Sequence, residues 1–232
     1  MVYDSKTETI FNYIDRNYKK TIVLFPGWAS DYRIFNLLDL EYNYLLPIKL
    51  NPFLFENFLF EEIKKNKLKK ISILGWSLGG SLAVEFALKY PDCINELILV
   101  SIRVKYSEQV ISQIKKYLRK NKKIFLYSFY NQCFFDKDSG KWFKENLLKS
   151  YCEDLVLSDL LEGLDYLKKE ELNFKKLKGV KKIKIIHGEQ DNIAPIEEAR
   201  GISNQLSNSK FISIKGGGHM PFFEDDFSKY VF

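Results

Sequence analysis

One serine stands between glycines in a segment whose residue types suit nucleophilic catalysis. Ser77 is the centre of Gly75-Trp76-Ser77-Leu78-Gly79, which follows the apolar run Ile71–Leu74 and precedes a helical pattern. A serine at a sharp strand-to-helix turn is strained, and its hydroxyl stands clear of the sheet. The pattern predicts a nucleophile at Ser77, with the N–H of Leu78 facing a developing oxyanion. The alternative is an ordinary strand–helix turn without chemistry.

A nucleophilic serine needs a base, and the chain has only 2 histidines. His219 follows three glycines and the last strand-like run, so a flexible segment can bring its imidazole over the sheet edge. His187 ends an earlier apolar run, where we interpret it as a structural residue and keep the role of base as its alternative. The sequence therefore favours His219.

An acid must orient the base. Asp191 follows the same apolar run as His187, and its carboxylate can accept the Nδ1–H of His219. Glu189 is a nearby competitor, and Asp191 is also a suitable helix cap or turn residue. The order Ser77, Asp191, His219 is the one used by a known class of hydrolytic triads, which favours Asp191.

A second oxyanion donor is expected in the loop after the first apolar run, where the sequence reads Phe25-Pro26-Gly27-Trp28. The backbone N–H of Trp28 is the candidate. Trp28 is alternatively a core aromatic residue. Both interpretations are compatible, because the donor is a backbone group and the ring is free to line a pocket.

Apolar runs and helical patterns alternate along the chain, and this alternation has to position the four groups above. The expected strands span residues 21–25, 44–50, 70–74, 96–101, 182–186 and 210–214, and the expected helices span 55–67, 82–89 and 196–206. Such alternation predicts an α/β fold with a mostly parallel sheet and helices on both faces.

One interval departs from the alternation. Between residues 101 and 179 the sequence shows helical patterns alone, rich in aromatic and charged residues. We therefore expect a core made of residues 1–101 and 180–232, with residues 102–179 inserted as a helical cap over the ligand-binding edge of the sheet. Phe125 and Phe129 have helical spacing and are candidates to roof an acyl channel.

The basic residues are concentrated at the start of this interval. The formal net charge is +6, and the segment 103–123 carries eight basic residues and one acid, Glu108. This segment is either a docking face for an acidic partner or the solvated face of a lysine-rich chain. Few arginines and no recognised binding module argue against nucleic acid.

The remaining composition narrows the class of protein. Length 232 and an apolar share of 46% suit one α/β domain with an insertion. Cys93, Cys133 and Cys152 lack metal-type spacing and are typical of free thiols in a reducing compartment, so we expect no metal site and a cytoplasmic location. We also expect no cofactor. We see no signal peptide and no membrane span, and we expect a monomer.

These motifs together resemble the α/β-hydrolase superfamily over nearly the whole chain. Within it, the sequence is most similar to the pimeloyl-[acyl-carrier protein] methyl ester esterases of biotin synthesis. The likeness is carried by FPGWAS, by the elbow GWSLGGSLA, by the end of the cap LEGLDYLKKEEL, and by the D-x-x-x-P spacing with GGGHMPF.

The resemblance implies a triad of Ser77, Asp191 and His219 with an oxyanion hole from Trp28 and Leu78. It also implies substrate contacts from a continuous stretch of the cap, Phe125, Leu126, Tyr127, Ser128 and Phe129. The implied activity is a serine carboxylesterase acting on the methyl ester of pimeloyl-[acyl-carrier protein], with the acyl-carrier protein as partner. The alternatives are a general short-chain carboxylesterase, a carbon–carbon bond hydrolase, or a non-catalytic binding module of the same fold.

Two features depart from the pattern of the relatives. Many relatives carry His-Gly before the oxyanion loop, where this chain has Pro26-Gly27. The basic cap residues of the relatives are only loosely kept, and Lys120, Lys137 and Lys141 fall near the places where relatives have Arg. The residues that we expect to dock a carrier protein are Arg119, Lys120, Lys123, Lys137 and Lys141.

Overall fold

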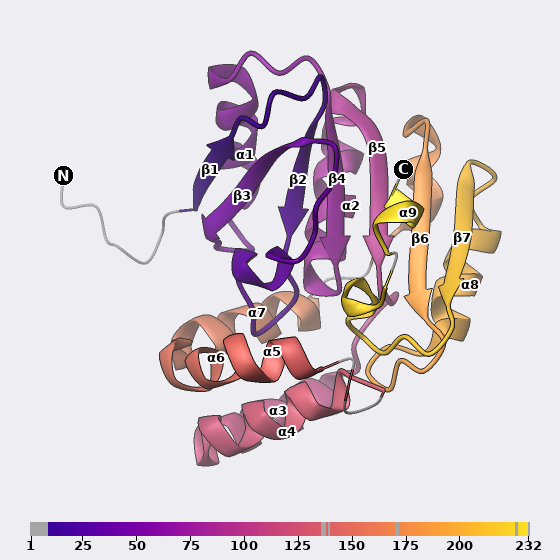
Figure 1. Ribbon diagram of the computed structural model, residues 1–232. Helices are drawn as coiled ribbons and strands as arrows, with labels where there is room; N and C mark the ends of the chain where they lie inside the picture. The colour runs from indigo at the N-terminus through magenta and orange to yellow at the C-terminus, as the bar shows by residue number, and fades with distance from the viewer. Residues whose placement is uncertain (1–8, 136–137, 139, 170–171, 226, 232) are drawn as a thin grey trace.

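The computed structural model describes residues 9–135, 138, 140–169, 172–225 and 227–231. Within this part of the chain, seven strands form one sheet in the order β1-β3-β2-β4-β5-β6-β7 (Figure 1). β1 pairs with β3 in antiparallel fashion, and every other neighbouring pair is parallel. The strands are β1 (Ile10–Ile14), β2 (Thr21–Phe25), β3 (Asn43–Lys49), β4 (Ile71–Trp76), β5 (Ile94–Val100), β6 (Ile183–Gly188) and β7 (Ser209–Ile214).

The central strands are apolar runs because both of their faces are covered. Every residue of β2 and of β4 is buried, as expected for parallel strands between layers of helices. The edge strand β1 was not among the expected strands. It alternates exposed and buried positions over only five residues, so its hydrophobic signal is weak and its strand conformation depends on pairing with β3.

Helices cover both faces of the sheet. Figure 1 shows α1, α2 and α8 behind the sheet and the short α9 in front of it. Their bounds are α1 (Phe55–Lys65), α2 (Leu78–Lys89), α8 (Ile196–Asn204) and α9 (Ser228–Val231). The 3-10 turns are η1 (Tyr32–Phe35), η2 (Pro91–Cys93), η3 (Phe174–Gly179) and η4 (Pro221–Phe223).

The remaining helices lie between β5 and β6 and sit below the carboxyl ends of the strands (Figure 1). They are α3 (Glu108–Lys120), α4 (Lys122–Gln132), α5 (Lys141–Asn146), α6 (Leu148–Asp154) and α7 (Leu157–Lys169), and we call them the cap helices. The predicted fold class, a mostly parallel sheet with an inserted helical cap, is confirmed. The division of the chain at residues 102 and 179 stays a prediction.

The junction of β4 and α2 is closely packed. A Cβ on Gly75 would lie 2.3 Å from the carbonyl oxygen of Gly79, and a Cβ on Gly79 would lie 2.2 Å from that of Phe25. Both contacts are with backbone, which side-chain rotation does not relieve. Helix α2 therefore packs directly against the ends of β2 and β4 because these two positions lack side chains.

We expect Gly79→Ala to displace the start of α2 and to lower the free energy of unfolding by about 1–3 kcal/mol, the usual cost of overpacking a core. Gly201→Ala in α8 is the matched control, because no atom lies within 4 Å of its added Cβ. That control should be stabilising by about 0.5–1 kcal/mol, since alanine favours a helix over glycine. Urea unfolding measures both, and equal stabilities would contradict the tight packing at residue 79.

Candidate active site

Ser77 occupies the turn between β4 and α2 in a strained backbone conformation. Its φ of 54° and ψ of −117° lie outside the regions that residues with a Cβ normally adopt. Its N–H donates to the carbonyl of Val100 at 2.9 Å, which ties the turn to β5. The hydroxyl is thereby fixed at the carboxyl ends of the strands, as the motif predicted.

Residues 77, 191 and 219 meet above the sheet. The Nε2 of His219 lies 3.1 Å from Ser77 Oγ, and its Nδ1 lies 2.8 Å from Asp191 Oδ2. With a proton on Nδ1 donated to the carboxylate, Nε2 is an acceptor for the serine hydroxyl. This arrangement allows His219 to remove the Ser77 proton as the oxygen attacks.

The carboxylate of Asp191 is enclosed and fully hydrogen-bonded. Its side chain has 0% exposure. Oδ1 accepts the N–H groups of Ile193 at 2.8 Å and Ala194 at 2.9 Å, and Oδ2 accepts from His219. Burial alone would raise its pKa, but the charge interaction with His219 and the hydrogen bonds hold the pKa well below its usual value. Asp191 is therefore ionised and able to stabilise an imidazolium at His219.

The two competing residues do not take the places of Asp191 and His219. Glu189 accepts an exposed hydrogen bond from the hydroxyl of Ser213, in the edge strand β7, at 2.9 Å. The Nε2 of His187 lies 2.8 Å from the carbonyl oxygen of Ala194 and 3.2 Å from Asp191 Oδ2. His187 thus contacts the aspartate, and it is the ring of His219 that meets Ser77.

The backbone of His219 is anchored at two points that sequence reasoning did not find. Its N–H donates to the carbonyl of Cys133, at the end of α4, at 2.8 Å. Its carbonyl accepts the indole N–H of Trp76 at 2.8 Å. The first of these hydrogen bonds joins the cap to the loop after β7 that carries His219. No local signal marks either contact, because each joins residues far apart in the chain.

The two expected oxyanion donors follow the neighbouring strands β2 and β4. Leu78 is the first residue of α2, so its N–H has no carbonyl one helical turn earlier to bond. Trp28 follows β2, and its indole Nε1 donates to the carbonyl of Leu160 in α7 at 2.8 Å. The Trp28 ring also packs edge-on against Phe129 at 5.1 Å and Phe125 at 6.3 Å. Trp28 therefore joins the core loop to the cap.

A cavity of about 280 Å³ opens over Ser77 and His219 beneath α3, α4 and α7. Its apolar walls include Trp28, Ile114, Phe125, Phe129, Leu164 and Leu167.

The cap stretch 125–129 contributes only its two phenylalanines to the cavity wall. Leu126 is buried in the core with 0% exposure, whereas Tyr127 and Ser128 face solvent. The expectation of a continuous contact stretch needs this correction, because residues four apart share a helix face and those between them do not.

Sequence reasoning also missed Arg103 and Tyr106, which line the same cavity. The Tyr106 hydroxyl interacts with the Ser77 hydroxyl, and burial raises the pKa of Tyr106. Its ring lies over the guanidinium of Arg103 at 4.6 Å, and Arg103 pairs with Glu198 at 2.9 Å. These residues precede α3 in an irregular segment, where no helical or strand pattern predicted their orientation.

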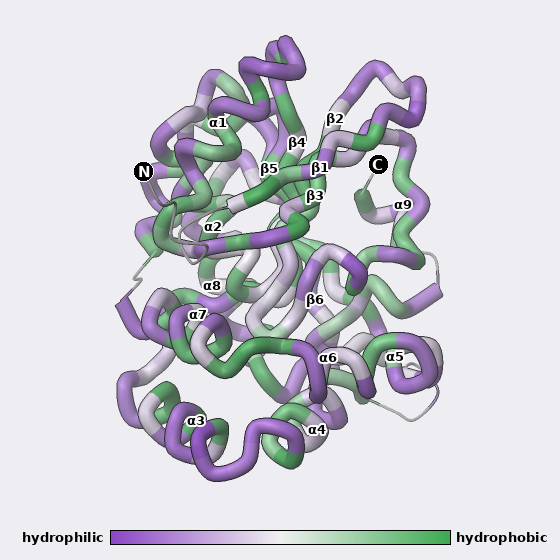
Figure 2. The backbone as a smooth tube through the Cα atoms, turned by 90° about the vertical axis from the view of Figure 1, so that its left-hand side faces the viewer, coloured by the Kyte–Doolittle hydropathy of each residue, from purple (hydrophilic) through white to green (hydrophobic). Residues whose placement is uncertain are grey.

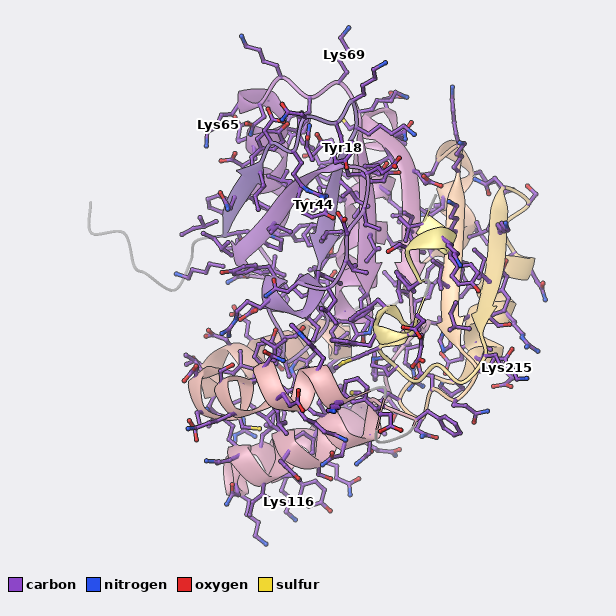
Figure 3. The ribbon with its side chains drawn as sticks, viewed as in Figure 1. Tyr18, Tyr44, Lys65, Lys69, Lys116 and Lys215 are labelled. Carbon is purple, nitrogen blue, oxygen red and sulfur yellow. The ribbon has the colours of Figure 1, made fainter. Side chains whose placement is uncertain are left out.

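The expected docking residues differ in their surroundings. Arg119 and Lys120 are exposed at the end of α3, and Lys141 is exposed at the start of α5. Lys123 pairs with Glu153 at 2.8 Å. Lys137 lies outside the described residues. Much of α3 is hydrophilic in Figure 2. In Figure 3 the side chain of Lys116, also in α3, extends outward at the bottom of the view.

Comparison with known proteins agrees with this geometry. Residues 55–226, most of the chain, match the family model described as serine aminopeptidase, S33. The chain belongs to this family of α/β hydrolases. Among solved structures, the esterase EaEST from Exiguobacterium antarcticum superposes with a TM-score of 0.80 at 19% identity, over 96% of this chain and 92% of that one.

Two curated relatives of this hydrolase carry the name pimeloyl-[acyl-carrier protein] methyl ester esterase. The protein from Nitrosospira multiformis is 28% identical over 162 residues, and that from Nitrosomonas europaea is 23% identical over 167 residues. The alignments cover 65% and 66% of this chain. They span 62% and 66% of the relatives' own lengths, less than two thirds in each case.

Two further observations concern the described residues of this hydrolase. Among the helices formed by these residues, none has both the length and the hydropathy that a bilayer-spanning segment requires. Nor do their histidine, cysteine and acidic side chains gather in groups of three or more that would hold a metal ion.

The lowered pKa of Asp191 predicts how its contribution to stability changes with pH. A carboxyl group with a depressed pKa stabilises the folded state above its unfolded pKa of about 3.9 and loses that contribution as the pH falls further. We expect the difference in unfolding free energy between wild type and Asp191→Asn to be largest near neutral pH and to shrink below about pH 4. Urea unfolding across pH measures it, and a constant difference would contradict the buried carboxylate.

Proposed function

We propose that this hydrolase is a serine carboxylesterase with Ser77 as nucleophile, His219 as general base and acid, and Asp191 as the group that orients His219. The observation that carries the proposal is the 3.1 Å contact between His219 Nε2 and Ser77 Oγ at a strained strand–helix turn. A hydroxyl, an imidazole and an enclosed carboxylate in this order constitute the machinery of acyl transfer. This arrangement argues against a non-catalytic binding module, because such a module does not need a hydroxyl, an imidazole and a carboxylate within hydrogen-bonding distance of one another.

In the first half of the reaction, Ser77 Oγ attacks the ester carbonyl carbon while its proton passes to His219 Nε2. The N–H groups of Trp28 and Leu78 stabilise the negative charge on the carbonyl oxygen. The tetrahedral intermediate then expels the alcohol oxygen, which takes the proton from His219. The products are a free alcohol and an acyl-serine.

In the second half, a water molecule attacks the acyl carbonyl carbon and gives one proton to His219. The carbon–Oγ bond breaks, and His219 returns the proton to Ser77. The carboxylic acid leaves, and the enzyme regains its starting state. Asp191 stays ionised throughout, because its four neighbouring donors favour the carboxylate.

For the substrate, we propose the methyl ester of pimeloyl-[acyl-carrier protein]. The names of the two curated esterases support this choice. The apolar cavity suits an acyl chain, and the exposed basic residues of α3 suit an acidic carrier protein. The carrier and its thioester would remain outside the cap, so that only the distal ester reaches Ser77. The unpaired state of Cys93, Cys133 and Cys152 fits the cytoplasm, where we expect this reaction.

Wild-type enzyme should release methanol from pimeloyl-[acyl-carrier protein] methyl ester, and Ser77→Ala should lower kcat by about 10⁴- to 10⁶-fold. Ser81→Ala is the matched control, because Ser81 lies one turn further along α2 and has no catalytic role in the proposal. It should retain near wild-type turnover. Methanol assays on the purified proteins give both values.

Equal methanol release by wild type and Ser77→Ala would refute the nucleophile. A panel of p-nitrophenyl esters and ring-cleavage diketones tests the substrate separately. Faster turnover of short esters or of a diketone than of the carrier-bound ester would reject the proposed substrate, in favour of a general short-chain carboxylesterase or a carbon–carbon bond hydrolase.

The double variant Arg119→Glu/Lys120→Glu should lower kcat/KM for the carrier-bound ester by about tenfold or more at low salt, since reversed charge opposes docking of an acidic partner. Turnover of a small p-nitrophenyl ester should stay unchanged. Lys69→Glu/Lys70→Glu is the matched control, because Lys69 lies at the opposite end of the molecule from the cap (Figure 3). Equal losses in the two double variants would remove α3 as the docking face.

A further inference from the structure

A second histidine shares the carboxylate of the triad. His187 is the penultimate residue of β6 and has 0% exposure, and its Nε2 lies 3.2 Å from Asp191 Oδ2 and 2.8 Å from the carbonyl oxygen of Ala194. His219 approaches the same Oδ2 at 2.8 Å. One carboxylate oxygen therefore faces two imidazoles, one of which reaches Ser77.

The surroundings of His187 determine its tautomer. Its Nε2 faces two acceptors, so the proton belongs on that nitrogen. Its Nδ1 is buried and has no hydrogen-bond partner among the described residues. A proton on Nδ1 would create a buried N–H without an acceptor, which costs free energy. His187 therefore presents the N–H of Nε2 to the two oxygen atoms.

These two acceptors belong to one tight turn. Asp191 Oδ1 binds the N–H groups of Ile193 and Ala194, which orients the carboxylate from the loop side. His187 binds Oδ2 of the same carboxylate and the carbonyl of Ala194 from the sheet side. A single imidazole on a rigid strand thus fixes both the side chain of Asp191 and the backbone of its loop.

We propose that His187 is a positioning residue of the active site, which holds Asp191 in the orientation that His219 requires and shares its negative charge. The inference rests on the proposed function, since it assigns His187 to the same triad. Without the second donor, more of the carboxylate charge acts on His219. The His219 imidazole then holds a proton more tightly, and the acid limb of the pH profile moves to higher pH.

The other ionisable groups near the Asp191 carboxylate do not account for a move of the acid limb to higher pH. Cys133 at the end of α4 and Tyr106 before α3 stay neutral near pH 7, because burial raises the pKa of both. Arg103 and Glu198, from the start of the cap and from α8, form an ion pair at 2.9 Å. His219 is the remaining group that faces Asp191 and takes up a proton in the proposed reaction.

The test compares His187→Asn with His187→Gln. The amide nitrogen of glutamine extends about as far as Nε2 and keeps the donor, whereas that of asparagine ends near Nδ1 and leaves Asp191 without it. We expect His187→Asn to lower kcat by about 10- to 100-fold, the range found for side chains that orient the ligands of a metal site by a similar hydrogen bond. Its KM should be unchanged and its acid limb shifted to higher pH. His187→Gln should restore kcat and the position of the limb.

Ile185→Val on the same strand is the control for stability. Ile185 is fully buried, and this change should lower the free energy of unfolding by about 0.5–1.5 kcal/mol. Its aliphatic side chain has no donor or acceptor for the Asp191 carboxylate. The change should therefore leave the pH profile unmoved. An Asn variant with the wild-type profile, or a Gln variant no better than Asn, would overturn the proposal.

A measurement on the unaltered protein covers the case in which a variant does not fold. Nitrogen NMR of labelled imidazoles should show the proton of His187 on Nε2, and a proton on Nδ1 would contradict the proposed donor. The outcomes separate the two proposals. An active Ser77→Ala refutes the esterase mechanism, whereas an inactive Ser77→Ala beside a fully active His187→Asn refutes only the role of His187.

Discussion

The active site depends on one close approach, that of helix α2 to the ends of β2 and β4. This approach requires glycine at residues 75 and 79 and forces Ser77 into its strained conformation. Strain of this kind costs about 1–3 kcal/mol and persists only when the surrounding structure fixes it. Here the fully buried β4 and the largely buried α2 supply that constraint. The hydroxyl of Ser77 and the N–H of Leu78 are therefore positioned by the core before any substrate binds.

The second requirement is an imidazole held at the correct distance from this hydroxyl. His219 follows a glycine-rich loop, and three bonds restrain it. Its backbone is tied to Trp76 in the sheet and to Cys133 in the cap, and its ring is tied to Asp191. Because one of these anchors belongs to α4, movement of the cap and the geometry of the base are physically coupled. The cap thus helps to hold the proposed base in place and also forms the roof of the cavity.

Electrostatic conditions within the site follow from burial. Asp191 is enclosed, so it stays charged only because every lone pair direction meets a donor. The cavity over Ser77 is bounded by aromatic and aliphatic side chains, and its roof carries the exposed basic residues of α3. Trp28 links these regions, since its backbone follows β2 while its ring packs against Phe129 and bonds to α7.

Much of this arrangement was determined by the sequence alone. Continuous apolar runs identified β2, β4 and β5, because strands buried on both faces need no alternation. The spacing Gly75-x-Ser77-x-Gly79 and the presence of only 2 histidines restricted the candidates for nucleophile and base. These signals are local: each depends on residue type and short-range conformation, which a linear pattern records.

The tertiary structure decided what depends on distant partners. The edge strand β1 depends on its pairing with β3. The orientation of α4 about its own axis determines that Phe125 and Phe129, and not the residues between them, face the cavity. The anchoring of His219 by Cys133 and the contact of His187 with Asp191 follow from how loops meet at the sheet edge. A side chain's partner across such a gap is set by the packing of the whole chain, and no local pattern encodes it.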